Sequence, residues 1–226
     1  MRFALSSEHM QKILIFVSTG RCGTTRLGEI LREKLPADKY QVEHQVSISR
    51  LANVLGNLMY YIGNSERIKK WIFNKLLRKY AKGKHFISTD PLTAMVIPKE
   101  ILNRKETYII HVTREPKSFA KSFYNFSRGR ALSFIAHNFV PLWQPTVWPL
   151  ENIVNPKIQK KYERVNWLKN RWFEKQYSSL SNYHKIPFEE IFEGKLLQET
   201  VNKCLGENLT ITDEDLGKKS NKSSFI

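Results

Sequence analysis

The sequence contains little cysteine, and its two cysteines, Cys22 and Cys204, lie far apart along the chain. This usage excludes a disulfide framework or a multi-cysteine zinc site as the basis of the fold. Long hydrophobic runs are also lacking, because the first apolar stretch, residues 13–17, is five residues long and ends near a glycine. Such a stretch is too short for a signal-peptide core or a membrane span. We therefore expect a soluble protein of a reducing compartment, located in the cytoplasm.

Acidic residues are scarce relative to basic ones. The 226 residues include 37 Lys and Arg against 21 Asp and Glu, which gives a formal net charge of +16 at pH 7. This excess indicates anionic partners, namely phosphate-bearing cofactors, acidic glycans, a membrane surface or nucleic acid. The hydrophobic content of 41% is enough to bury one substantial core. We expect a single domain over residues 1–226, with a polar tail that frays from about residue 217.

Five short runs rich in β-branched and aromatic residues predict strands. They cover residues 13–18, 40–42, 85–88, 107–112 and 183–188, and most of the segments between them have helical spacing. Strands that alternate with helices in this way favour a parallel sheet. The predicted fold class is α/β, with a central parallel sheet flanked by helices in three layers.

The segment 65–85 predicts a helix with two unlike faces. It begins with a capping serine, Ser65, and its lysines and arginines cover one face. The apolar face contains Ile68, Trp71, Ile72, Leu76 and Tyr80. We interpret this segment as a core helix with a solvated basic face; the alternative is a face that contacts an acidic substrate or lipid headgroups.

Two further segments are rich in aromatic residues. The loop 138–157 contains four prolines and two tryptophans, which is typical of a packed lid or a substrate-side insertion rather than a free linker. Farther along, Trp167, Trp172 and Phe173 share one face of a predicted helix, and this spacing favours a core position over an adenine-binding one.

The stretch "ILIFVSTGRCGTTRLGEIL" predicts a strand, a glycine-containing turn and a helix in direct succession. A turn of this kind presents unpaired backbone N–H groups and the positive end of a helix dipole, which together bind a phosphate. Arg21 and two hydroxyls add to this capacity. The predicted anion-binding residues are Thr19, Gly20, Arg21, Cys22, Gly23, Thr24 and Thr25.

Two common nucleotide motifs fit this turn poorly. A P-loop needs glycine and lysine where this chain has Ser18 and Thr24, which weakens a magnesium–triphosphate interpretation. A dinucleotide fingerprint needs G-x-G-x-x-G, whereas the glycines here are spaced differently, although Glu43 lies about where a ribose-binding acid would be.

A second strand-to-helix junction occurs in "TYIIHVTREPKSFAKSFYNF", residues 107–126. Arg114 stands at the predicted tip of the strand, Pro116 near the start of the following helix, and Ser122 eight residues after the arginine. An arginine and a serine are thus expected to converge beside the first turn.

The two stretches, in this order, resemble the sulfotransferase family, which uses 3'-phosphoadenosine-5'-phosphosulfate as sulfate donor and releases 3',5'-bisphosphorylated adenosine. The resemblance implies a P-loop-like fold in which "GRCGTT" binds the 5'-phosphosulfate and Arg114 and Ser122 bind the 3'-phosphate. It extends to "FISTDPLTAMVIPKEI" and to "IPFEEIFEGKLLQETVNKCLG", which are similar to later elements of the family.

Two positions depart from the family pattern. Cys22 stands where serine is usual, and a thiol is a weaker donor than a hydroxyl. Arg26 stands where cytosolic members carry a tryptophan that stacks on adenine. These differences favour carbohydrate-, lipid- or protein-modifying relatives over the phenol and steroid enzymes.

Sulfuryl transfer to a hydroxyl, or to an amine, needs charge stabilisation and a base, and no metal. We expect Arg21, the loop N–H groups and the two threonine hydroxyls to stabilise the leaving phosphate. Four groups are candidate bases: Glu43 and His44 rank first, then Asp90, and then Glu29 by resemblance to some carbohydrate-modifying members.

Two other functions stay open at this point. One is a P-loop-like kinase or other nucleotide enzyme, and the other is a basic module that binds a membrane or nucleic acid. The preferred interpretation is a sulfotransferase whose partners are the donor nucleotide and a hydroxyl-bearing acceptor, such as an acidic glycan or a lipid. It includes peripheral membrane contact as an option and does not include nucleic acid.

Overall fold

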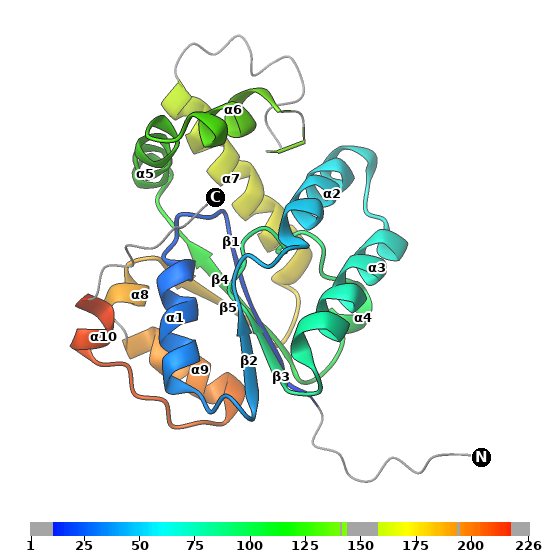
Figure 1. Ribbon diagram of the computed structural model, residues 1–226, viewed down its shortest axis with the longest axis vertical. Helices are drawn as coiled ribbons and strands as arrows, with labels where there is room; N and C mark the ends of the chain where they lie inside the picture. Colours follow the sequence, from blue (N-terminus) through cyan, green and yellow to red (C-terminus); the bar gives the residue numbers. More distant parts are fainter. Residues whose placement is uncertain (1–10, 141, 144–157, 194, 218–226) are drawn as a thin grey trace.

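The computed structural model describes residues 11–140, 142–143, 158–193 and 195–217 (Figure 1). Five strands form one sheet in the order β2-β3-β1-β4-β5, and all four neighbouring pairs are parallel. The strands are β1 (Ile13–Ser18), β2 (Tyr40–Glu43), β3 (His85–Ser88), β4 (Thr107–Thr113) and β5 (Tyr183–Pro187). The predicted α/β class with a central parallel sheet is confirmed. Most of the predicted lid, residues 144–157, and nearly all of the tail lie outside the described residues.

Alternate residues of the central strand β1 face two different helix layers (Figure 1). Ile13, Ile15 and Val17 contribute to one buried cluster, and Leu14 and Phe16 contribute to the other. This period of two is what a strand buried on both faces requires. The two clusters make β1 the centre of a three-layer structure.

The helices divide between these layers and the carboxyl end of the sheet (Figure 1). The first cluster includes residues of α2 (Ser49–Ile62), α3 (Glu66–Leu76), the π-helical η1 (Leu77–Ala81), α4 (Lys99–Leu102) and α7 (Ile158–Tyr177). The second includes residues of α1 (Thr24–Lys34), α8 (Glu190–Glu193) and α9 (Lys195–Leu205). α5 (Pro116–Arg128) and α6 (Ala131–Phe139) lie at the carboxyl end (Figure 1), whereas α10 (Asp213–Gly217) contacts α8 and the start of α1.

Local sequence signals explain two of the helix starts. The Ser65 side chain accepts a hydrogen bond from the backbone N–H of Ile68 at 3.5 Å and caps α3, as expected. Pro116 occupies the start of α5, and the Glu115 carboxylate caps this helix by accepting from the N–H groups of Lys117 at 2.9 Å and Ser118 at 2.6 Å. Both helices therefore begin where a side-chain oxygen accepts a hydrogen bond from a backbone N–H group that has no partner within the helix.

Two tryptophans do not occupy the predicted core. Trp71 is 53% exposed and Trp167 is 50% exposed, whereas Ile72, Leu76 and Phe173 are buried. The two predictions were wrong because each tryptophan lies at the margin of its apolar stripe, where helical spacing alone does not distinguish core from surface. The Trp167 ring instead lies under the Arg171 guanidinium, 5.0 Å from the ring centroid.

The parallel arrangement brings both sequence motifs to one edge of the sheet. β1 and β4 are neighbours, with Ser18 paired to Val112, so the turns that follow them emerge side by side. Ligands of open parallel sheets bind at this carboxyl edge. The fold therefore places the turn 19–23 and Arg114 next to one another.

Candidate active site

The turn between β1 and α1 has an unusual backbone. Gly20, Arg21 and Gly23 have φ values of 85°, 53° and 69°, in the left-handed region. Glycine adopts this region freely, but Arg21 does so at a cost, and strained residues of this kind cluster at functional sites. α1 begins directly after Gly23, with no side-chain cap and no acidic residue in its first turn. Its first N–H groups are thus available to an anion.

Two side chains of the turn point into the protein rather than out of it. Cys22 is fully buried, its thiol donates to the carbonyl of Gly20 at 3.1 Å, and burial raises the pKa of the thiol to about 11. Thr19 is 5% exposed, and its hydroxyl accepts from the Asn166 side chain at 3.0 Å. These two residues shape the turn and can meet a ligand through their backbone only.

A buried polar chain ties the turn to α7 and the sheet. Asn170 donates to Asn166 at 3.0 Å and faces Nε2 of His111 at 3.0 Å, while Nδ1 of His111 lies 2.7 Å from the Tyr183 hydroxyl. Burial lowers the pKa of His111 to about 4, so this imidazole is neutral at pH 7. The chain from Tyr183 to Thr19 rigidifies the base of the turn.

Arginines gather around the turn. Arg114 donates from Nη1 to the backbone carbonyl of Arg21 at 2.6 Å and from Nε to the Ser118 hydroxyl at 3.1 Å. Arg21 and Arg130 both lie over the ring of Phe126, at 4.4 and 4.5 Å from its centroid. Desolvation lowers the pKa of Arg21 first, and the charges of Arg114 and Arg130 lower it further. Like charges brought this close indicate a site for an anion of high charge.

The obvious acidic neighbour does not neutralise this cluster. Glu115 adjoins Arg114 in the sequence, but its carboxylate caps α5, and no ion pair joins the two side chains. The Arg114 guanidinium instead lies 4.2 Å from the ring centroid of Phe188. Ser122 is half-buried two turns into α5 and makes no hydrogen bond with any described residue. Arg114 and Ser118 therefore line one side of the cluster, and Ser122 follows Ser118 by one helical turn.

His44, at the end of β2, contacts the first turn of α1. Its Nδ1 lies 2.9 Å from the carbonyl oxygen of Thr89, which only accepts, so Nδ1 carries the proton. Nε2 therefore accepts from the Thr25 hydroxyl at 3.0 Å. Burial lowers the pKa of His44, and the imidazole is neutral at pH 7. A basic nitrogen lone pair is thus directed at the turn.

Gly28 makes this contact possible. A Cβ atom at Gly28 would lie 2.6 Å from the Thr89 hydroxyl oxygen and 3.6 Å from Cβ of His44. Such a separation is far below van der Waals contact, so only glycine lets α1 approach the ends of β2 and β3 this closely.

The other candidate bases are engaged elsewhere. Glu43 accepts from the Gln41 side chain at 2.7 Å, and Glu29 pairs with Arg26 at 3.2 Å. Asp90 is 2% exposed and accepts from the hydroxyl of Ser49 and from the Leu92 N–H group, and burial raises the pKa of its carboxyl to about 6. The structure therefore brings His44, but not these carboxylates, into contact with the turn.

Sequence reasoning missed several residues of the site. Ser118, Phe126, Arg130, Asn166 and Phe188 carry no motif of their own. Of these, only Ser118 had a usable signal, because it lies one helical turn after Arg114 and one before Ser122. The others come from distant segments and depend on the fold.

Lys169 is another side chain without a sequence signal. It lies on α7, three residues after Asn166, and is 4% exposed. It makes no hydrogen bond or ion pair with the described residues, and burial lowers its pKa to about 8. Burial lowers the pKa of His137 to about 3, and the positive charge of Lys169 acts in the same direction.

The described residues lack both a metal-binding cluster and a membrane-spanning helix. They contain no group of three or more His, Cys, Asp or Glu side chains able to hold a metal ion. No helix among them is both long enough and apolar enough to cross a membrane.

Comparison with known proteins gave one family. Residues 11–194 match the family model described as "Sulfotransferase domain". Among solved structures, the mouse sulfotransferase SULT7A1 complexed with PAP is similar, with a TM-score of 0.48 and 16% identity over 90% of this chain and 61% of that chain. This chain thus spans less than two thirds of the mouse enzyme.

Two bacterial structures are also similar. The sulfotransferase domain of the Synechococcus PCC 7002 olefin synthase has a TM-score of 0.47 and 12% identity, over 95% of this chain and 78% of that one. The sulfotransferase from Alicyclobacillus acidocaldarius has a TM-score of 0.45 and 15% identity, over 91% and 88%. A search of the curated proteins found no match.

Proposed function

The chain belongs to the sulfotransferase family, and we propose that it transfers a sulfuryl group from 3'-phosphoadenosine-5'-phosphosulfate to a hydroxyl or amine of an acceptor. The observation that carries this proposal is the convergence of Arg21 and Arg114 on the uncapped start of α1. A donor with a 5'-phosphosulfate and a 3'-phosphate supplies the two anionic groups that such an arrangement suits.

In this proposal the donor is held at both of its phosphates. The N–H groups at the start of α1, together with Arg21 and Thr24, bind the 5'-phosphosulfate. Arg114, Ser118 and Ser122 bind the 3'-phosphate, the group that distinguishes this nucleotide from ATP and NAD. The charge-assisted hydrogen bonds of Arg114 supply most of that discrimination.

The sulfuryl group is transferred by in-line displacement, with the acceptor oxygen opposite the leaving phosphate. The acceptor oxygen forms a bond to sulfur while the bond from sulfur to the 5'-phosphate oxygen breaks, and the electron pair leaves with that phosphate. Arg21 stabilises the charge on the leaving oxygen. An acceptor hydroxyl replaces Thr25 as the group that donates to His44 Nε2, and this nitrogen takes the acceptor proton. His44 is preferred as the base because Glu43, Asp90 and Glu29 are engaged in other contacts.

The acceptor is proposed to be a carbohydrate, a lipid or another hydroxyl-bearing compound. Arg26, at the position of the adenine-stacking tryptophan of cytosolic members, donates from Nε and Nη2 to the carbonyl of Asp215 at 3.0 and 2.6 Å. This residue fastens α10 to α1, and the adenine platform must come from elsewhere. A single domain and a cytoplasmic location remain predictions.

Calorimetry at fixed salt tests the donor assignment. Arg114→Ala should weaken 3',5'-bisphosphorylated adenosine by about 2 to 3 kcal/mol and the 5'-monophosphate by clearly less, because only the former carries the 3'-phosphate. Arg128→Ala, at an exposed position at the end of α5, is the control and should change neither affinity.

Two results would contradict the donor assignment. One is an equal loss for both nucleotides in Arg114→Ala, which would make the arginine a support of the fold. The other is displacement of the bisphosphate by magnesium ATP at comparable concentration, which would favour a P-loop-like kinase.

A further inference from the structure

A groove runs along α3 and η1, and part of it reaches the start of α2. One part has a volume of about 580 Å³ and is lined by Trp71, Asn74, Lys75, Arg78 and Lys79. The adjoining part, of about 240 Å³, is lined by Ser47, Ile48, Leu51, Lys75, Lys79 and Tyr80. Because Lys75 and Lys79 line both parts, they form one continuous depression, which we call the basic groove.

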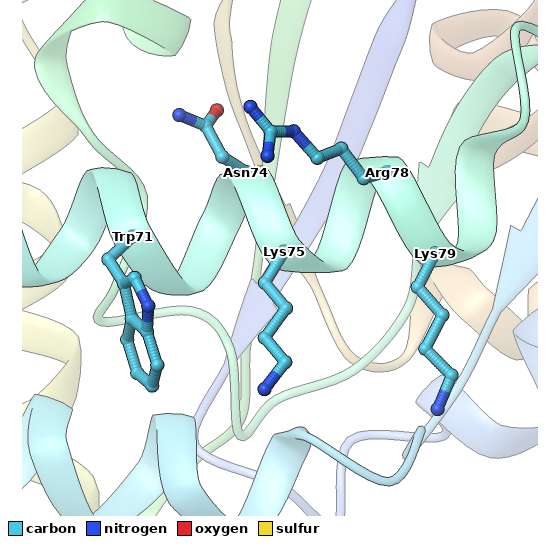
Figure 2. Close-up of a pocket in the computed structure, with 5 residues that line it drawn as sticks. All are labelled: Trp71, Asn74, Lys75, Arg78 and Lys79. Atoms are coloured by element: carbon cyan, nitrogen blue, oxygen red, sulfur yellow. The ribbon is translucent and has the colours of Figure 1, made fainter.

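The side chains of the basic groove are arranged in a regular row. Trp71, Lys75 and Lys79 follow one another at intervals of four residues and point to the same side of the helix, whereas Asn74 and Arg78 point to the other side (Figure 2). An interval of four residues is about 6 Å along a helix axis. The groove thus presents an aromatic ring and two cations in sequence along one wall.

The cations of this groove have no acidic partners. On the same helix, Lys69 pairs with Glu66 at 3.3 Å and Lys70 pairs with Glu100 at 2.8 Å. Lys75, Arg78 and Lys79, by contrast, make no ion pair with any residue of the described ranges. Their positive charge is therefore available to a ligand.

Aromatic rings hold two of these cations in place. The Lys75 ammonium lies 5.4 Å from the ring centroid of Trp71, and the Lys79 ammonium lies 5.1 Å from that of Tyr80. Lys79 also donates to the Ser47 hydroxyl at 3.1 Å. These contacts position the ammonium groups without neutralising them, since a ring quadrupole attracts a cation but carries no net charge.

One end of the basic groove lies close in the sequence to the candidate base. Ser47 lines the groove and follows His44 by three residues, and His44 Nε2 lies 3.0 Å from the Thr25 hydroxyl. Because Ser47 is only three residues from His44, we take an extended acceptor to reach from His44 to the groove.

We propose that the basic groove binds an acidic oligosaccharide and presents one of its hydroxyls for sulfation. This inference rests on the proposed function. Sugar rings have apolar C–H faces that stack on exposed aromatic rings such as Trp71, while their carboxylates pair with Lys75 and Lys79. A row of one exposed ring and two cations at intervals of about 6 Å suits a chain of sugar rings that carries carboxylates, so the oligosaccharide is the occupant that the spacing and the charge favour.

The test uses a fluorescently labelled, unsulfated hexasaccharide of alternating uronic acid and N-acetylhexosamine. Its affinity is measured by anisotropy at several salt concentrations for the whole chain and for the double variant Lys75→Glu and Lys79→Glu. The matched control is Lys195→Glu with Lys203→Glu, which changes the net charge equally at exposed positions of α9. We expect the groove variant to lose at least tenfold in affinity and the control less than threefold.

A second variant separates stacking from charge. Trp71→Ala should weaken the hexasaccharide about threefold or more, and a carboxyl-reduced, neutral form of the sugar should bind at least tenfold more weakly than the acidic one. Equal losses in the groove variant and the α9 control, or no measurable binding of the hexasaccharide, would overturn the proposal.

Competition identifies a different occupant. Vesicles containing phosphatidylserine, or a single-stranded oligonucleotide, that displace the hexasaccharide at lower concentration than unlabelled hexasaccharide would also overturn it. Calorimetry with 3',5'-bisphosphorylated adenosine on the same variants keeps the two proposals distinct. If nucleotide binding fails while the groove still selects the sugar, the donor assignment is wrong; if nucleotide binding persists without sugar binding, the groove assignment is wrong.

Discussion

Replacing Lys169 by methionine should raise the free energy of unfolding at pH 7, because the native protein buries this charge without a partner among the described residues. Burial lowers the pKa of Lys169 to about 8 from its ordinary value of 10.5. Each unit corresponds to 1.36 kcal/mol, so the protonated side chain costs the native state about 3 kcal/mol. Methionine keeps an unbranched apolar chain at this 4% exposed position and removes the charge.

The stability difference between the Lys169→Met variant and the natural sequence should decrease as the pH rises. The folded protein loses the Lys169 proton near pH 8, whereas the unfolded chain keeps it up to about pH 10.5. Between these values the unfolded chain binds more protons, so the stability of the natural sequence rises with pH and approaches that of the variant. Below pH 8 both states are protonated, and the full difference of about 3 kcal/mol is present.

Urea unfolding at pH 7, 9 and 10.5 measures this difference. Lys175→Met, at an exposed position of the same helix, is the control and should change the unfolding free energy by less than about 0.5 kcal/mol at each pH. A Lys169→Met protein that is less stable at pH 7, or a difference that does not shrink between pH 8 and 10.5, would refute the reasoning. Either result would mean that the ammonium has a partner.

Three further changes test the turn and its contacts. Arg21→Ala should reduce turnover by roughly a hundredfold while changing nucleotide affinity less, because the arginine acts on the departing phosphate; near-normal single-turnover rates would remove it from the mechanism. Since burial lowers the pKa of His44, activity should persist somewhat below pH 6.5 and fall as the imidazole protonates, and His44→Gln should lose both turnover and this acid limb. A pH–rate profile with an acid limb centred at or above 6.5 would contradict the role of His44. Gly28→Ala should lower the free energy of unfolding by about 1 to 3 kcal/mol in urea, because its Cβ would collide with the Thr89 hydroxyl; unchanged stability would show that this approach is not needed.

Much of the fold could be predicted because its signals are local. Each of the five strands ends within one residue of its predicted limit, since every run of β-branched residues is bounded by turn or charged residues. The starts of α3 and α5 followed from Ser65 and Pro116, whose chemistry acts within one helical turn. The order of the strands in the sheet was not predicted, because the crossover connections that set which strands are neighbours have no signature in the sequence.

The site could be predicted only where a motif carried it. The turn 19–25 and Arg114 were recognisable, whereas Asn166 reaches Thr19 across 147 residues and has no local signature. The basic face of segment 65–85 could be predicted from the sequence. The exposed position of Trp71 beside Lys75 could not, because Trp71 lies at the edge of the apolar face to which the helical spacing assigned it. Contacts between segments that are distant in the sequence can be identified only once the order of the strands in the sheet is known.

The choice among the four candidate bases illustrates the same limit. Sequence reasoning places Glu43, His44 and Asp90 at strand ends, where any of them could reach a ligand. Only the structure shows that Asp90 is buried and accepts a hydrogen bond from Ser49, and that Glu43 accepts one from Gln41. Hydrogen-bond partners, rather than positions along strands, therefore decide which group is free to take a proton.

Arg114 couples the two ends of the proposed donor site. Its guanidinium donates from Nε to the Ser118 hydroxyl, in the proposed 3'-phosphate site, and from Nη1 to the backbone carbonyl of Arg21 at 2.6 Å, which holds the turn in its left-handed conformation. An alanine removes both functions, so some loss of 5'-monophosphate affinity is expected alongside the larger loss for the bisphosphate. Arg114→Gln retains a neutral donor for the carbonyl and removes the charge, and its loss should therefore be confined to the nucleotide that carries the 3'-phosphate.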